Sequence, residues 1–163
     1  MPEPKGYSAT QIALHWGILL LIAAQVVFNA PMTEAWEKVQ DGGVKTFDLG
    51  VMAHIIGGLT VLGLVMWRLA LRRGRGVPAA PAGEAPLLRL VAHGTHVALY
   101  GLMLLVPVSG VIAWFGNVAA AAEAHEVMKT LLIVLILLHA AAALYHQFWL
   151  KDGLLNRMRQ PQD

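Results

Sequence analysis

The sequence predicts an all-α integral membrane protein, a bundle of four helices. Of its 163 residues, 57% are hydrophobic and only 13% are charged. Four apolar segments are each long enough to cross a hydrocarbon core of roughly 30 Å, which takes about 20 helical residues. A helix also satisfies its own backbone polar groups within lipid. We therefore predict one membrane domain over residues 1–163, with spans at Ser8–Phe28, Leu49–Leu71, Leu87–Phe115 and His125–Leu150.

Basic residues are divided unevenly between the two ends of the predicted bundle. Four spans place both termini on one side, and that side holds nine of the 12 basic residues. Because cytoplasmic loops carry an excess of lysine and arginine, we expect the termini to be cytoplasmic. The first span carries His15 and Gln25 without a strongly basic leader, which favours a retained helix over a cleaved signal peptide. The nine residues are Lys5, Arg68, Arg72, Arg73, Arg75, Arg89, Lys151, Arg157 and Arg159.

The connections between the spans differ in character. The first, residues 29–48, is a polar outer loop in which Trp36 is expected at the membrane interface. The second, residues 74–86, reads GRGVPAAPAGEAP, where glycine and proline prevent a continuous helix. Within the third span, Pro107 predicts a kink. The last connection, residues 116–124, is short, so the third and fourth spans should be antiparallel neighbours.

Several classes of function are excluded by what the sequence lacks. There is no cysteine, which removes disulfides, thiolate iron-sulfur clusters, covalent c-type haem and thiol catalysis. No glycine-rich phosphate loop, nucleophile elbow or zinc-protease motif is present. The isoelectric point near 9.2 does not indicate nucleic acid, because the positive charge lies in short loops beside membrane spans.

Three histidines lie on one stripe of the fourth span. His125 and His139 are 14 residues apart, which places them about 21 Å apart along the helix axis and only about 40° apart around it. His146 continues the stripe, and Ala140–Ala143 makes the surface beside His139 small. A lone membrane histidine is more often a hydrogen-bond bridge between helices. Several ionisable groups at two depths instead indicate function, and the pattern predicts two haems, one near each leaflet.

Topology restricts which histidines can share one iron. His54 and His125 both lie near the outer surface, whereas His15 and His139 both lie toward the inner side. Axial ligands approach iron from opposite sides, so we pair His54 with His125 and His15 with His139, each pair holding one haem b. Such sites leave no open position on the iron, which favours electron transfer over oxygen binding. The predicted chemistry is one electron crossing the membrane.

Further residues are candidates for roles around the inner haem. His93 and His96 lie three residues apart on one helix, so they cannot bind one iron from opposite faces. Three roles remain open for them. They are alternative ligands of the inner iron, hydrogen-bond partners of the haem propionates or of another ligand's free ring nitrogen, or polar contacts between helices. Arg68 lies at the same level, together with Arg72 and Arg89. These arginines either pair with propionates or anchor the helices to lipid headgroups.

Two glycines, Gly57 and Gly58, follow His54 by one turn. They allow either close packing between membrane helices or the approach of a porphyrin face to the backbone. The sequence leaves these alternatives open.

Five sequence blocks resemble the bacterial cytochrome b561 family of four-helix di-haem membrane proteins. They are IALHW around His15, AHIIGG around His54, MWRLALR, AHGTHVALY and the C-terminal HAAAALYHQFWLKDGLLNRM. The most similar branch is that of the superoxide oxidases. The resemblance implies an inner-membrane protein that passes electrons from periplasmic superoxide through two b haems to ubiquinone. It makes His15, His54, His125 and His139 the axial ligands and places His146 near the quinone.

The outer face departs from that branch in its charge and in a shorter loop between the last two spans. It carries three lysines, Lys38, Lys45 and Lys129, against six carboxylates: Glu34, Glu37, Asp41, Asp48, Glu123 and Glu126. Capture of an anion benefits from a positive funnel. One alternative is therefore a haem-bearing relay subunit between the quinone pool and a partner dehydrogenase, hydrogenase or basic soluble carrier. Another is a histidine-lined proton or metal transporter without haem. Expected partners are lipid, a quinone and a periplasmic donor, with homo-oligomers or a partner subunit possible, and no nucleic acid.

Overall fold

The computed structural model describes residues 4, 6–79 and 86–162, and these form helices and connections without a strand. Four of the described helices are long and apolar enough to cross a membrane, which confirms the predicted fold class. They are α1 (Ala9–Val27), α3 (Leu49–Gly74), α4 (Pro86–Gly116) and α5 (Ala119–Tyr145), the last extended by the π-helical turn η1 (His146–Leu150). Outside the described residues lie Lys5, one of the nine basic residues named above, and residues 80–85 of the predicted linker.

Side-chain caps explain where the first two spans begin. Ser8 caps α1: its hydroxyl accepts from the Gln11 amide at 3.2 Å, and the Gln11 side chain accepts from the Ser8 amide at 3.0 Å. Asp48 caps α3 by accepting from the Val51 amide at 3.0 Å. Each cap satisfies a backbone donor that the first helical turn leaves unpaired. These polar residues stand directly before apolar runs, so the chain enters each span at a defined residue.

The outer connection contains a helix that the sequence did not predict. Residues expected as a polar loop form α2 (Ala30–Gln40), with Pro31 in its first turn. Ala35 on this helix is buried against Val51 and Trp114, and Met32 and Trp36 pack beside them. One face of the helix, on which Met32, Ala35, Trp36 and Val39 recur at helical spacing, is covered by α3 and α4. Trp36 therefore belongs to a packed cluster at the outer end of the bundle.

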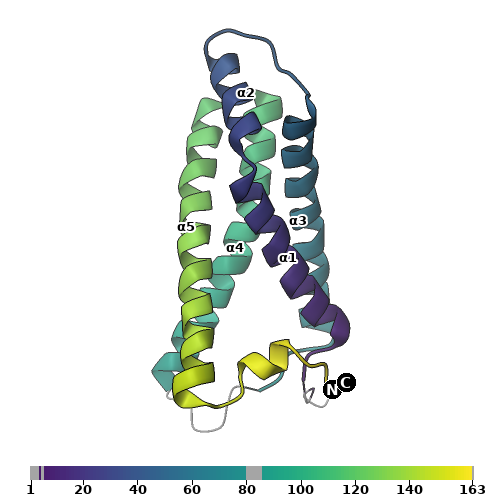
Figure 1. The fold of residues 1–163 in the computed structure, drawn as a ribbon, viewed down its shortest axis with the longest axis vertical. Helices are drawn as coiled ribbons and strands as arrows, with labels where there is room; N and C mark the ends of the chain where they lie inside the picture. Colours follow the sequence, from purple (N-terminus) through teal and green to yellow (C-terminus); the bar gives the residue numbers. More distant parts are fainter. Residues whose placement is uncertain (1–3, 5, 80–85, 163) are drawn as a thin grey trace.

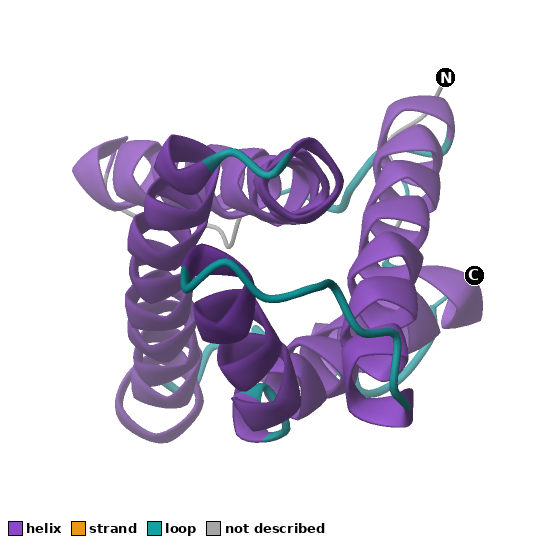
Figure 2. Ribbon diagram, turned by 90° about the horizontal axis from the view of Figure 1, so that it is seen from above, coloured by secondary structure: helices purple, strands orange, loops and turns teal. Residues whose placement is uncertain are grey.

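The long helices pack in the order α1, α3, α4, α5. Figure 1 shows α1 inclined across the bundle, and Figure 2 shows the helices from above. Only Asn117 and Val118 separate α4 from α5, which confirms that these spans are antiparallel neighbours. Apolar residues such as Leu137 and Leu138 point outward, as expected of a surface that contacts lipid. Pro107 lies within α4 without ending it.

Residues 151–162, here called the C-terminal strap, cross the lower end of the bundle from α5 toward α1 (Figure 1). The indole nitrogen of Trp16 donates to the Met158 carbonyl at 2.8 Å, and Arg157 donates to the Ala79 carbonyl at 2.7 Å. The Gln162 amide also donates to the Tyr7 carbonyl at 3.2 Å. The strap therefore joins the end of α5 to the start of α1, so the first and last described residues lie at the same end of the bundle.

Candidate functional site

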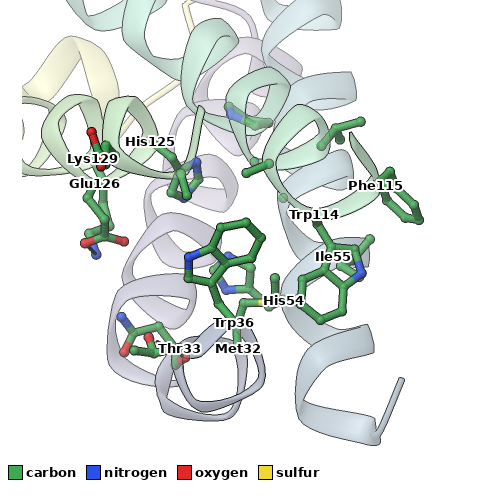
Figure 3. Close-up of a pocket in the computed structure, with 18 of the residues that line it drawn as sticks. Met32, Thr33, Trp36, His54, Ile55, Trp114, Phe115, His125, Glu126 and Lys129 are labelled. Carbon is green, nitrogen blue, oxygen red and sulfur yellow. Dashed lines mark hydrogen bonds and ion pairs between the residues drawn. The ribbon is translucent and has the colours of Figure 1, made fainter. Parts of the chain in front are cut away.

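The two histidines predicted to lie nearer the outer surface, here called the outer pair, come from two helices that are not neighbours in the packing order. His54 on α3 and His125 on α5 have ring centroids 6.4 Å apart, with the ring planes at 65°. Both rings border a pocket of about 650 Å³ near α2. Figure 3 shows His54, His125, Trp36 and Met32 around this pocket. Ligand pockets commonly fall in this size range and have mostly apolar walls, so the space suits a large apolar group between the two histidines.

The backbone of α4 orients the ring of His125. Its Nδ1 lies 2.8 Å from the carbonyl oxygen of Val106 and 3.3 Å from the hydroxyl of Ser109. Because a carbonyl only accepts hydrogen bonds, Nδ1 must carry the proton, and Nε2 keeps its lone pair. A Cβ at Gly110 would lie 3.1 Å from the His125 ring. The absence of a side chain at Gly110 therefore lets this ring approach α4, in the arrangement expected of a metal-binding histidine.

The region beside His54 contains two buried polar atoms without hydrogen-bond partners among the described residues. They are Nδ1 of His54 and Oε1 of Gln25, and both residues border a second pocket of about 70 Å³. A Cβ at Gly57 would lie 1.9 Å from the Gln25 amide nitrogen, whereas nothing lies within 4 Å at Gly58. The two glycines thus have different surroundings: Gly57 packs against α1, and Gly58 faces open space beside His54.

The inner pair repeats this geometry at the other depth. His15 on α1 and His139 on α5 have ring centroids 6.3 Å apart, with the ring planes at 73°. His96 on α4 is closer, with its ring centroid 5.2 Å from that of His139. Its Nδ1 donates to the Ala92 carbonyl at 2.7 Å. His93 is exposed on the same helix, so the structure brings His15, His96 and His139 together and leaves His93 at the surface.

These spacings test whether the residues present fit an iron held from two sides. An imidazole nitrogen binds a metal at about 2 Å, and the ring centre lies about 1 Å behind that nitrogen. Two rings holding one metal from opposite sides therefore have centroids about 6 Å apart. The pairs His54 with His125 and His15 with His139 fit this requirement at 6.4 and 6.3 Å. At 5.2 Å, His96 and His139 are too close to hold one metal from opposite sides.

Arg68 joins three helices beside the inner pair. Its Nε donates to the Tyr100 hydroxyl on α4 at 3.0 Å, and its guanidinium also donates to the Gln11 carbonyl on α1. The Gln11 side chain in turn donates to the Gly76 carbonyl at 3.2 Å. Arg68 lies close enough to His15 and His139 to act on both electrostatically. Its pairing with a propionate stays a prediction, but the structure places its charge next to the inner pair.

His146 lies at the start of η1, where α5 meets the strap. Its Nδ1 donates to Oδ2 of Asp152 at 2.5 Å, and the Leu154 amide donates to Oδ1 at 3.0 Å. Burial opposes ionisation of Asp152, but these two hydrogen bonds outweigh it and hold the pKa of this carboxyl below its usual range. His146 therefore anchors the strap, and the proposed role near a quinone stays a prediction.

The outer pocket is more acidic than basic. Three glutamates, Glu37, Glu123 and Glu126, and a single lysine, Lys129, line it. Lys129 is paired with Glu126 at 2.5 Å. A positively charged funnel would help to capture an anion. The pocket wall contributes one lysine to such a funnel, and this lysine already has an acidic partner. Lys45 lies over the Trp114 ring instead, 5.9 Å from its centroid.

Four helices long and apolar enough to cross a membrane, with histidines in facing pairs at two levels, are typical of membrane haem electron carriers. Residues 6–161 match the model of the prokaryotic cytochrome b561 family, and this chain belongs to that family. The family binds b-type haem and transfers electrons in bacterial membranes. Because this family binds haem, the alternative of a histidine-lined transporter without haem is set aside.

Relatives match over nearly the whole chain. A cytochrome b562 of Cereibacter sphaeroides is 39% identical, and the match covers 99% of this chain and all of the relative. A probable superoxide oxidase of Yersinia pestis is 28% identical over 94% of this chain and 96% of its own length. Cytochrome b561 homolog 1 of Escherichia coli is 29% identical over 93% and 96%.

Sequence reasoning missed the residues that surround the outer pair. Met32 and Trp36 line the pocket from α2, a helix that the sequence did not predict. Val106 and Gly110 act on His125 through a backbone carbonyl and a missing side chain. The sequence signal for this support was the pair of small residues Ser109 and Gly110, which follows Pro107. This pattern predicts a kink, and it does not by itself indicate that the helix positions a ligand.

Proposed function

We propose that this chain carries electrons across the bacterial inner membrane through two b haems within one domain, residues 1–163, with both termini in the cytoplasm. His54 and His125 hold the outer haem, and His15 and His139 hold the inner one. The observation that carries the proposal is the spacing of the two pairs, 6.4 and 6.3 Å between ring centroids, with α5 contributing to both.

Bound haem iron supplies reversible one-electron chemistry between its ferric and ferrous states. The protein's residues decide how that chemistry is used. Two histidines would hold each iron, which would leave oxygen no place to bind and would favour electron transfer without bond formation. The Val106 carbonyl holds the proton on Nδ1 of His125, which keeps Nε2 available. Histidines on one helix at two depths provide the path through the membrane.

For the donor and acceptor, we propose superoxide outside and ubiquinone at the inner side. The likeness to the probable superoxide oxidase of Yersinia pestis supports this assignment. In the balanced reaction, two superoxide anions each give up one electron and become dioxygen. One quinone takes the two electrons and two protons and becomes quinol. His146 is at the inner end of α5, where a quinone in the inner leaflet would approach.

Haem quantitation and a pulse of superoxide test the proposal in purified protein. We expect about two haems per chain, rapid haem reduction after the pulse, and reoxidation when ubiquinone is added. Stoichiometric protein that folds without haem would reject the electron-transfer assignment. Two haems that superoxide reduces no faster than in heat-inactivated protein would reject superoxide alone.

The acidic lining of the outer pocket favours a second candidate, a haem relay that receives electrons from a basic protein partner. Ionic strength separates the two, because salt screens charge interactions. Salt should accelerate the approach of an anion to an acidic surface and slow the approach of a basic protein. Gentle detergent extraction gives a second test, since a stable larger complex with no superoxide activity in the isolated chain would favour the relay.

A further inference from the structure

The charges beside the two histidine pairs differ. Around the inner pair, the guanidinium of Arg68 donates to the carbonyl of Gln11, one turn before His15 on α1, and acts on both histidines of the pair. Around the outer pair, Lys129 acts on both histidines but is paired with Glu126, and the pocket wall has more carboxylates than lysines. One pair is therefore next to a cation without an acidic partner among the described residues, and the other is next to a cation that a carboxylate neutralises.

The charge of Arg68 is not neutralised within the described part of the chain. The groups that it contacts, the Tyr100 hydroxyl and the Gln11 carbonyl, are both uncharged. Arginine stays protonated in proteins. These contacts hold the guanidinium between α1, α3 and α4, so it remains a fixed positive charge inside the membrane bundle.

A fixed charge changes how easily a neighbouring iron is reduced. Reduction adds one negative charge to the site, so a nearby cation stabilises the reduced form and nearby carboxylates destabilise it. The effect is large where water and salt screen little, as within a membrane bundle. It is smaller at the outer pocket, because the side chain of Glu126 is 63% exposed.

We infer that Arg68 raises the reduction potential of the inner haem above that of the outer haem and thereby drives electrons inward. This inference rests on the proposed function and assigns a residue as the cause of its inward direction. The outer pair, beside a lysine that Glu126 neutralises and a mostly acidic pocket wall, holds the haem that gives up its electron more readily. The inner pair, next to Arg68, holds the haem that keeps it.

Potentiometric titration of the visible haem bands tests the inference in the wild type and in four variants. Arg68→Gln removes the charge, whereas Arg68→Lys keeps the charge without the planar guanidinium. In Arg68→Gln, we expect the one-electron equilibrium of the inner haem to shift toward the oxidised form about tenfold, or about 59 mV. Arg68→Lys keeps the charge and should therefore retain most of the wild-type potential. If the potential depended instead on helix packing around the guanidinium, both Arg68 variants should lower it. Arg73→Gln, an exposed charge on the same helix, should change the potential much less.

The fourth variant, His139→Ala, assigns the potentials without changing Arg68. We expect it to lose the component of higher potential and keep the lower one, so this result stands even if Arg68→Gln binds haem poorly. The inference is overturned if His139→Ala loses the lower component, or if Arg68→Gln keeps both haems at wild-type potentials. Fewer than two haems in the wild type would instead reject the proposed function, and the inference with it.

Discussion

His54 and His125 face each other with their ring centroids 6.4 Å apart, although they lie on α3 and α5, which pack mainly against other helices. The same holds for His15 and His139, at 6.3 Å on α1 and α5. In each pair, the two helices make few contacts with each other, but their histidine rings lie close together. At the outer pair, the space between the helices includes the pocket of about 650 Å³.

Removing one histidine of each pair should remove a different haem. His54→Ala should lose the outer haem and His139→Ala the inner one, because a single imidazole leaves the iron half-ligated. Reduced-minus-oxidised spectra with haem quantitation measure this, and His93→Ala, at an exposed position, serves as the control with both haems retained. If both test variants kept both haems, the ligands would have to be other residues, and His96 would be the first candidate.

Gly110→Ala should disturb the outer site through His125. The added Cβ would lie 3.1 Å from the ring, which forces the ring to move away from the Val106 carbonyl. We expect weaker retention of the outer haem and a loss of about 1–3 kcal/mol in stability, as is typical of overpacking. Gly101→Ala on the same helix is the matched control, since nothing lies within 4 Å of its Cβ. Equal behaviour of the two variants in thermal unfolding and haem content would contradict this role of Gly110.

Gly58→Leu should fill the space beside His54. Because Gly58 borders both pockets with nothing within 4 Å of its added Cβ, we expect a lower content of outer haem with the inner haem unchanged. Gly63→Leu provides the control, because Gly63 is exposed on the same helix and also has open space. Full occupancy of both haems in Gly58→Leu would show that the cofactor does not use this space.

The C-terminal strap should loosen when Asp152 loses its charge. Hydrogen bonds hold the pKa of Asp152 below its ordinary value of 3.8. The ionised carboxyl therefore stabilises the strap above that value, and this contribution is lost as the pH falls through the lowered pKa. Asp152→Asn should mimic the loss at neutral pH. Hydrogen exchange of residues 151–162 measures it, with Asp41→Asn in the outer connection as the control. Unchanged exchange in Asp152→Asn would reject the anchoring role.

The fold and the depth of each candidate ligand could be predicted from the sequence, but their surroundings could not. The order of spans and the close approach of His15 to His139 and of His54 to His125 agree with the structure. Ligation of iron by these residues stays a prediction. The helix α2 was not anticipated, although its sequence carries a signal for it. Met32, Ala35, Trp36 and Val39 recur at helical spacing, and they form the face that packs against α3 and α4.

The sequence by itself determined the four spans and the level of each histidine, because both depend on counting apolar residues along one helix. Only the tertiary structure decided that Val106 and Gly110 support His125, that Arg68 bridges to Tyr100 and Gln11, and that the strap reaches Trp16. These contacts join residues far apart in the chain. They depend on how the helices are rotated and inclined against each other, which local apolar periodicity does not specify.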